Sequence, residues 1–155
     1  YYGKALHRVL VEGHPWTPLS PRRIRLKGSS IQIDFHVPVP PLQIDTNRVW
    51  LKSNYGFEYA DDTASASLQS VSLWGDRSIV LQLNRAPSGA NPRVRYAWTG
   101  TPGSTPGWNQ SGSARGNIRD SDATPSLYGQ SLANWLVHFD LPIPYGPPAP
   151  QPGLS

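Results

Sequence analysis

Apolar residues recur at every second position in three consecutive segments between residues 70 and 100. The three rows are Val71 and Leu73, then Ile79, Leu81 and Leu83, and finally Val94, Tyr96 and Trp98. Because successive side chains of a strand point to opposite faces, each row marks a strand with one apolar face. Turn-forming residues separate the rows, at Gly75-Asp76 and at residues 87–92. The region therefore predicts an up-down-up antiparallel meander with one buried face that includes Trp98.

Proline and glycine argue against a helical bundle. The 155-residue chain contains 17 prolines and 14 glycines, and each proline inside a helix costs about 3 kcal/mol. Strand-like segments instead recur at intervals of roughly 8 to 12 residues. This spacing predicts an all-β fold, an immunoglobulin-like antiparallel β-sandwich of about seven to nine strands.

Strand-like segments also lie outside the region of residues 70–100. Arg22 to Leu26 and Ile31 to Val37 flank a Gly-Ser-Ser turn and predict a hairpin. The proline-rich residues 37–42 lack ladder donors and are expected at an edge or in a crossover between sheets. Further strands are expected at Val49 to Leu51, at Asn54 to Tyr59 and at Asn134 to Ile143. In the last of these, alternation would place Trp135, Val137 and Phe139 on one face and Leu136, His138 and Asp140 on the other.

The ends of the chain differ in character from its centre. Residues 1–20 are expected to form a short N-terminal helix over Tyr1 to Val11, or an extended segment, followed by a linker. Residues 21–143 are expected to form the sandwich. Residues 144–155 are rich in proline and glycine and predict an unpacked tail. Since the chain begins at Tyr1 and has no methionine, we expect it to be a piece of a longer polypeptide or a chain processed at its N-terminus.

Several classes of function are disfavoured by composition. The chain has no cysteine, which leaves no disulfide framework and no thiolate metal site. No apolar run reaches the roughly 20 residues that span a bilayer, so no membrane association is expected. The net charge of +4 includes one dense basic cluster, Arg22, Arg23, Arg25 and Lys27. We interpret it as a solvated strand face rather than a polyanion site, and a nucleic-acid partner is not favoured.

Catalytic patterns are weak. The four histidines are scattered without metal-ligand spacing. Residues Gly129 to Ala133 (GQSLA) approximate a nucleophile elbow around Ser131, but no strand-turn-helix context surrounds them. Only Glu12 and Glu58 are glutamates, and most aspartates lie in turn-like stretches. The fragment is therefore not expected to be an enzyme. That it is a hydrolase in its own right is less favoured than the accessory and structural roles described below.

Five segments together carry a family resemblance: FHVPVPPL at 35–42, NYGFEY at 54–59, RVRYAWTG at 93–100, ARGNIRDSD at 114–122 and NWLVHFDLPI at 134–143. This pattern resembles the C-terminal β-sandwich module that follows an SGNH-type, sialate O-acetylesterase-like hydrolase domain in proteins of phages, prophages and bacteria. Tyr1 to Val11 is similar to the closing helix of that hydrolase. The hydrolase's nucleophile block and Asp-x-x-His block are not found in this chain.

The resemblance implies a non-catalytic accessory module. Its parent chain would be a carbohydrate esterase-like hydrolase, and an extracellular or virion-associated location is favoured. The leading hypothesis is a glycan-binding or substrate-presenting role, and the alternative is a structural or assembly module of a phage tail or surface protein. The expected partners are accordingly a polysaccharide or glycan, and a hydrolase domain in the same chain or a phage or surface assembly.

A candidate binding site follows from the longest irregular stretch, Thr101 to Ser113, which carries a single aromatic residue, and from the polar segment after it. Aromatic faces stack on sugar rings while polar groups bind hydroxyls. The candidate ligand-binding residues are Trp108, Arg115, Asn117, Arg119 and Tyr128. Of the other aromatic residues, Trp50, Tyr55 and Trp74 lie near turns, whereas Trp98 and Trp135 are expected to be packed.

Asn117, Asp120 and Asp122 carry side-chain oxygens at short spacing, a pattern that also suggests a Ca²⁺ site. Arg115 and Arg119 are interleaved with these residues. We therefore favour a hydrogen-bonded network between Arg119 and the two aspartates over a metal site. No cofactor is expected, and Ca²⁺ is the less favoured alternative.

Overall fold

The computed structural model describes residues 2–100 and 113–148. A short helix, α1 (Tyr2–Leu6), continues into a π-helical turn (His7–Val11) ahead of the strands. The strands are β1 (Ser20–Lys27), β2 (Ser30–His36), β3 (Gln43–Ile44), β4 (Phe57–Ala60), β5 (Leu68–Trp74), β6 (Ser78–Leu83), β7 (Arg93–Tyr96), β8 (Ile118–Arg119) and β9 (Phe139–Pro142), with a 3₁₀ turn at Ser53–Gly56. No helix among these residues has the length and apolar character needed to cross a membrane.

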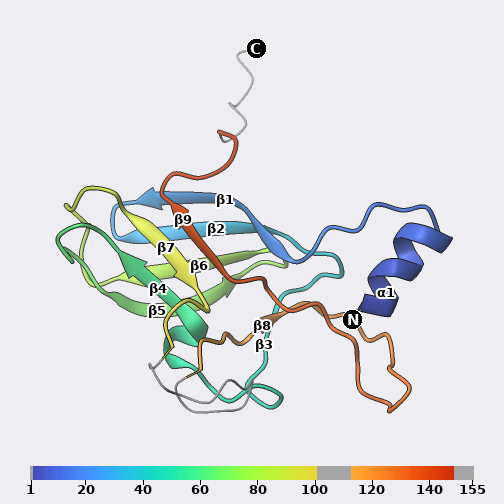
Figure 1. Cartoon of the computed structure of the whole chain (residues 1–155). Coiled ribbons are helices and arrows are strands. Elements are labelled where there is room, and N and C mark those ends of the chain that lie inside the picture. The colour runs from blue at the N-terminus through green and yellow to red at the C-terminus, as the bar shows by residue number, and fades with distance from the viewer. Residues whose placement is uncertain (1, 101–112, 149–155) are drawn as a thin grey trace.

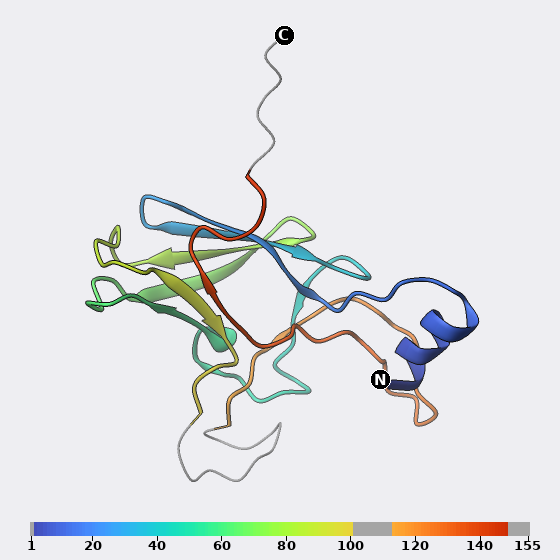
Figure 2. The same cartoon turned by 45° about the horizontal axis from the view of Figure 1, so that its top comes forward.

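All strand pairs are antiparallel, and they form two main layers. One sheet has the order β1-β2-β6-β5 and the other the order β4-β7-β9, while β3 and β8 make a small third sheet. Figures 1 and 2 show the two larger sheets stacked, with the helical segment at one end of the molecule. A single apolar cluster joins both layers. The prediction of an all-β antiparallel fold with a short N-terminal helix is confirmed.

The predicted three-stranded meander is wrong in its third strand. β5 and β6 pair as expected, but β7 lies between β4 and β9 in the opposite sheet. Residues 87–92 therefore carry the chain from one layer to the other. Trp98 follows the end of β7 and is 47% exposed, so it does not belong to the core. Alternation shows which face of a strand is buried, but it does not show which strand lies alongside.

The last predicted strand is shorter than expected, because β9 covers only Phe139–Pro142. Leu136 and Phe139 are both buried although alternation placed them on opposite faces. The chain before β9 pairs irregularly: Trp135 forms an isolated bridge with Arg119, and the Val137 N–H donates to the Leu19 carbonyl. These separate partners rotate successive side chains out of a strict two-residue repeat.

Two further expectations need correction. Val49 to Leu51 is not a strand, and Asn54 and Tyr55 have positive φ in the 3₁₀ turn before β4. The expected tail is packed at its start, since Tyr145 pairs with Ile24 of β1 through two backbone hydrogen bonds. Arg25 adds hydrogen bonds to the Tyr145 and Pro147 carbonyls.

Three aromatic rings from the β4-β7-β9 sheet form the centre of the core. The ring centroid of Tyr96 lies 4.8 Å from that of Phe57 and 5.8 Å from that of Phe139. The buried Tyr96 hydroxyl accepts a hydrogen bond from the Ile118 N–H of β8 at 3.0 Å. Gly116 lies against this ring, and a Cβ added there would come 2.1 Å from Tyr96 Cζ. The core thus fixes the segment that enters β8.

This contact gives a test of the core. Gly116→Ala forces the Tyr96 ring or the backbone to move, and overpacking of this kind lowers the free energy of unfolding by about 1–3 kcal/mol. The control is Gly3→Ala in α1, where nothing lies within 4 Å of the added Cβ. Urea unfolding followed by fluorescence should show the loss only for Gly116→Ala. Equal stability of the two variants would contradict this account of the core.

Candidate functional site

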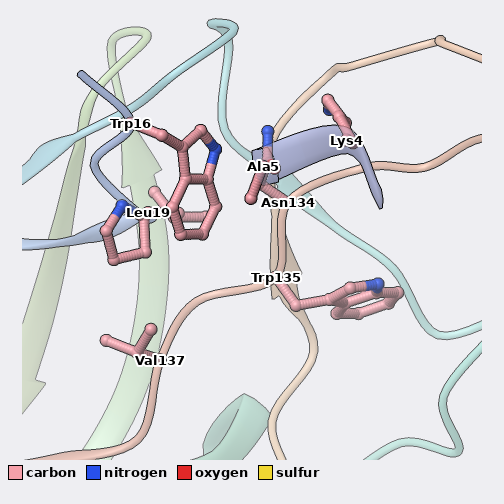
Figure 3. A pocket seen from close by; sticks show the side chains of 8 residues that line it. Lys4, Ala5, Trp16, Leu19, Asn134, Trp135 and Val137 are labelled. Carbon is pink, nitrogen blue, oxygen red and sulfur yellow. The ribbon is translucent and has the colours of Figure 1, made fainter. Parts of the chain in front are cut away.

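One hollow lies between the N-terminal segment and the chain leading into β9. Its volume is about 480 Å³, a size typical of small-molecule sites. Figure 3 shows the side chains that surround it, which are Lys4, Ala5, Trp16, Pro18, Leu19, Asn134, Trp135 and Val137. The lining is mostly apolar and contains two tryptophans. We refer to it as the indole pocket.

The two indoles come from segments far apart in the sequence. Trp16 lies in the extended stretch between the helical turn and β1, and Trp135 in the irregular stretch before β9 (Figure 3). Both are half-buried, and Leu19, which also lines the pocket, is fully buried. The backbone hydrogen bond from Val137 to Leu19 joins the two stretches at 3.2 Å. The pocket therefore has a fixed apolar base with two partly exposed aromatic walls.

A buried carboxylate holds the polar side of the pocket. Asp120 is 0% exposed and accepts hydrogen bonds from the backbone N–H groups of Val39 (3.1 Å), Asp122 (3.1 Å) and Asn134 (2.8 Å). It also accepts one from Asn134 Nδ2 at 2.6 Å. Asn134 is thus fixed through both its backbone and its side chain before the chain reaches Trp135.

An ion pair attaches the helix that completes the pocket. Lys4 Nζ of α1 donates to the Asp122 carboxylate and to the Leu132 carbonyl, the latter at 3.1 Å. Both side chains of the pair are largely buried. Burial alone would raise the pKa of Asp122, but hydrogen bonds from Lys4 and Thr124 outweigh it and lower the pKa to about 2. The carboxylate is therefore charged at neutral pH and keeps Lys4, and with it Ala5, against the sandwich.

A second hollow of about 500 Å³ also has Lys4 in its lining. Its lining is more polar and includes His7, Arg8 and Glu12 from the helical segment together with Thr124. His7 Nδ1 lies 3.3 Å from Glu12 Oε1, and Arg8 Nε lies 3.9 Å from Glu12 Oε2. These groups pair with one another on the same segment, which leaves the hollow without a convergent set of polar groups.

The network expected around Arg119 exists with a different partner. Arg119 Nε pairs with Asp45 Oδ2 at 2.6 Å, and it meets Asp120 only through the Asp120 carbonyl at 2.8 Å. Burial would raise the pKa of Asp45, but hydrogen bonds from the Arg48 and Asn47 N–H groups and from Arg119 lower it overall. The predicted pairing of Arg119 with the carboxylates of Asp120 and Asp122 is wrong, because Asp120 is occupied by backbone donors and Asp122 by Lys4.

The structure does not gather the candidate ligand-binding residues on one surface. Asn117 is 0% exposed, and its Nδ2 donates to the Asp45 and Val49 carbonyls while its Oδ1 accepts from the Lys52 N–H. Arg115 Nε donates to the Trp50 carbonyl at 3.0 Å. Arg119 is paired with Asp45. Tyr128 is 90% exposed on the turn between Pro125 and Ser131, and Trp108 lies outside the described residues.

The calcium candidate and the nucleophile candidate can also be located. Across residues 2–100 and 113–148 there is no group of three His, Cys, Asp or Glu side chains arranged to hold a metal ion. The oxygens of Asn117, Asp120 and Asp122 accept the hydrogen bonds already described. Ser131 pairs with Pro125 across a turn, and its Oγ accepts from Arg48 Nη1 at 3.0 Å. It is therefore not on a strand-to-helix elbow.

Sequence reasoning missed the indole pocket. Trp135 was expected to be packed, and no local pattern in the sequence shows that it lines one hollow together with Trp16. Lys4 and Asp122 are 118 residues apart in the sequence, so no local motif could predict that they pair.

Comparison with known proteins supports the fold. No protein-family model matches the chain, and no curated protein matches it. The crystal structure of a carbohydrate acetylesterase from Xanthomonas citri is similar, with a TM-score of 0.51 and 17% sequence identity. The match covers 87% of this chain but only 25% of the esterase chain. The chain thus resembles part of a carbohydrate esterase structure, and at this identity the likeness shows the fold alone.

Because Asp120 accepts four hydrogen bonds in a buried place, we expect the near-isosteric substitution Asp120→Asn to reduce stability strongly. In Asp120→Asn, either amide orientation points an NH₂ group at two N–H donors, and the unpaired donors cost about 1–3 kcal/mol. The matched control is Asp76→Asn in an exposed turn, which should change stability by no more than about 0.5 kcal/mol. Thermal unfolding of both variants measures the difference. A loss of similar size in Asp76→Asn would contradict the role assigned to the buried carboxylate.

The Lys4–Asp122 pair predicts a dependence on pH. The folded pKa of about 2 lies below the ordinary value of 3.8, so its stabilising contribution is complete above the ordinary value and is lost as the pH falls toward the folded one. Asp122→Asn lacks the carboxylate. The difference in unfolding free energy between wild type and Asp122→Asn should therefore narrow from about pH 5 to about pH 2. A difference that stays constant across this range would show that Asp122 has an ordinary pKa.

Proposed function

We propose that this protein is a non-catalytic accessory module of a carbohydrate esterase-like hydrolase and that it binds glycan in the indole pocket. The observation that carries the proposal is the placement of Trp16 and Trp135 as partly exposed walls of one hollow. The likeness to part of a carbohydrate acetylesterase supports the association with such a hydrolase.

The chemistry of the pocket suits a sugar ring. A pyranose has apolar C–H faces and a polar hydroxyl edge, so it needs aromatic surface together with a few fixed polar groups. The indoles supply the aromatic surface. Asn134, fixed by its bonds to Asp120, supplies an amide whose position is set before any ligand arrives. A pre-organised site of this kind loses little side-chain entropy on binding.

The proposal predicts that glycan binding depends on both indoles. Affinity gels containing hydroxyethyl cellulose, xylan, mannan or β-1,3-glucan should retard the wild-type protein in at least one case. Trp16→Ala and Trp135→Ala should each weaken that binding by about tenfold or more, because each removes one aromatic wall on which the sugar ring stacks; tenfold corresponds to about 1.4 kcal/mol.

Trp74→Ala is the matched control, because Trp74 is an indole 66% exposed on the edge strand β5, away from the pocket lining. Retardation by none of the gels would end the proposal. Equal weakening by the Trp74 variant would mean that binding is not located in the pocket.

A second candidate function is a structural or assembly module, and a specific observation favours it. The helical segment exposes four large aliphatic side chains: Leu6, Val9, Leu10 and Val11. On the nearby turn, Leu127 is 99% exposed. Figures 1 and 2 both place this turn and α1 at the same end of the molecule. Apolar surface gathered in this way commonly contacts another protein.

Light scattering at increasing protein concentration distinguishes this alternative. An assembly role predicts self-association or binding to a hydrolase domain that Leu10→Lys abolishes, whereas glycan retardation would be unaffected by that variant. A monomer at all concentrations with unchanged behaviour in Leu10→Lys would count against assembly through this surface.

A further inference from the structure

The outer face of the β4-β7-β9 sheet carries a row of charged side chains. In the strand register, Arg95 of β7 lies opposite Glu58 of β4 on one side and Asp140 of β9 on the other. Their sequence neighbours Phe57, Tyr96 and Phe139 are buried in the core. Because alternate residues point to opposite faces, the charged row faces outward, with neighbouring strands about 4.8 Å apart.

An exposed indole lies beside this row. Trp98 follows β7 and is 47% exposed. The Arg95 guanidinium carbon lies 6.0 Å from its ring centroid, and the His138 ring centroid lies 6.5 Å away at an interplanar angle of 32°. These contacts fix the orientation of Trp98 while nearly half of its surface remains open.

Arg95 is incompletely satisfied. Its Nε is buried and makes no hydrogen bond among the described residues. It lies 3.3 Å from Asp140 Oδ2, but the direction of the N–H does not give a hydrogen bond. Asp140 already accepts from Arg93 Nε at 2.6 Å. The buried Nε is out of reach of a ligand, but the Arg95 side chain is 32% exposed and its Nη groups make no hydrogen bond among the described residues. These terminal donors beside an exposed indole suit a hydroxyl-rich ligand.

The charges of the row indicate which ligand it suits. Glu58 and Asp140 face Arg93 and Arg95, so two carboxylates balance two guanidinium groups. Glu58 accepts hydrogen bonds from the Thr99 N–H (3.1 Å) and hydroxyl (2.7 Å), but a carboxylate has further acceptor positions. Glu58, Arg95 and Asp140 therefore alternate acceptor, donor and acceptor across three strands. Together with Arg93, which pairs with Asp140, the four groups carry no net charge. Hydroxyl groups match this alternation, whereas an added carboxylate would meet Glu58 and Asp140.

From this arrangement we infer a second glycan-binding site that is independent of the indole pocket and accepts a neutral pyranose. The sugar ring stacks on Trp98, Arg95 donates to its hydroxyl oxygens, and Asp140 and Glu58 accept from its hydroxyl groups. The site shares no lining residue with the indole pocket. Its existence does not depend on binding in that pocket.

Indole NMR signals test both sites at once. The chain has six tryptophans, and each gives one Nε1–H signal that a Trp→Phe variant assigns by its disappearance. The protein is titrated with cellohexaose, xylohexaose, mannohexaose and laminarihexaose, and with hexagalacturonate as the acidic comparison. The inference predicts a saturable shift of the Trp98 signal with at least one neutral oligosaccharide and a response to hexagalacturonate at least tenfold weaker in affinity.

Variants locate the response. Trp98→Ala should abolish the binding measured at this site, and Arg95→Gln should weaken it about tenfold or more, while Trp74→Ala leaves it unchanged. Unfolding curves of the exposed-site variants check that the fold is intact. The wild-type titration remains decisive if a variant is unstable.

Each outcome separates the second site from the proposed function. Shifts of Trp16 and Trp135 with an unmoved Trp98 would overturn the second site and leave the pocket proposal standing. A shift of Trp98 alone would support the second site and contradict the pocket. Shifts of none of these signals would overturn both, and tighter binding of hexagalacturonate at Trp98 would overturn the assignment of a neutral sugar.

Discussion

The buried carboxylate of Asp120 is the interaction on which the pocket side of the molecule depends. Its four N–H donors come from the chain after β2, from its own loop and from the stretch that leads to β9. None of these segments is long enough to make an extended ladder, so side-chain acceptors replace the missing backbone pairing. Just before β8, the Asn117 side chain acts as a donor instead: its Nδ2 donates to carbonyls of the irregular chain between β3 and β4. Two buried polar side chains thus organise a region that strands alone do not hold.

The parts of the fold that sequence predicted were those set by alternation and turns. The β1-β2 hairpin and the β5-β6 pair follow from local periodicity and glycine-containing turns, and the structure has both. The position of β7 in the opposite sheet could not be predicted, because residues 87–92 allow either a hairpin or a crossing between layers. Leu136 and Phe139 are buried together because the chain before β9 takes its partners from Leu19 and Arg119. Such long-range partners leave no periodic trace.

The site was less predictable than the fold. The segment 114–122 stands out in the sequence because it is rich in polar and charged residues. In the structure Asn117 and Asp120 of this segment are fully buried, and their side chains form hydrogen bonds within the protein. The indoles of Trp98 and Trp135 were expected in the core because aromatic residues in a β-sandwich are most often buried, but one is exposed and the other half-exposed. Whether an indole faces solvent depends on where the strand ends relative to the tryptophan and on whether another segment covers the ring. Neither can be read from residue type.

Lys4 attaches the helical segment of residues 2–11 to the rest of the fold. Different side chains of this segment meet the pocket and the solvent. Lys4 and Ala5 of α1 line the indole pocket, while Leu10 and its aliphatic neighbours in the following turn, His7–Val11, are exposed. A partner bound to the exposed aliphatic side chains would therefore restrict the movement of the same short segment that lines the pocket.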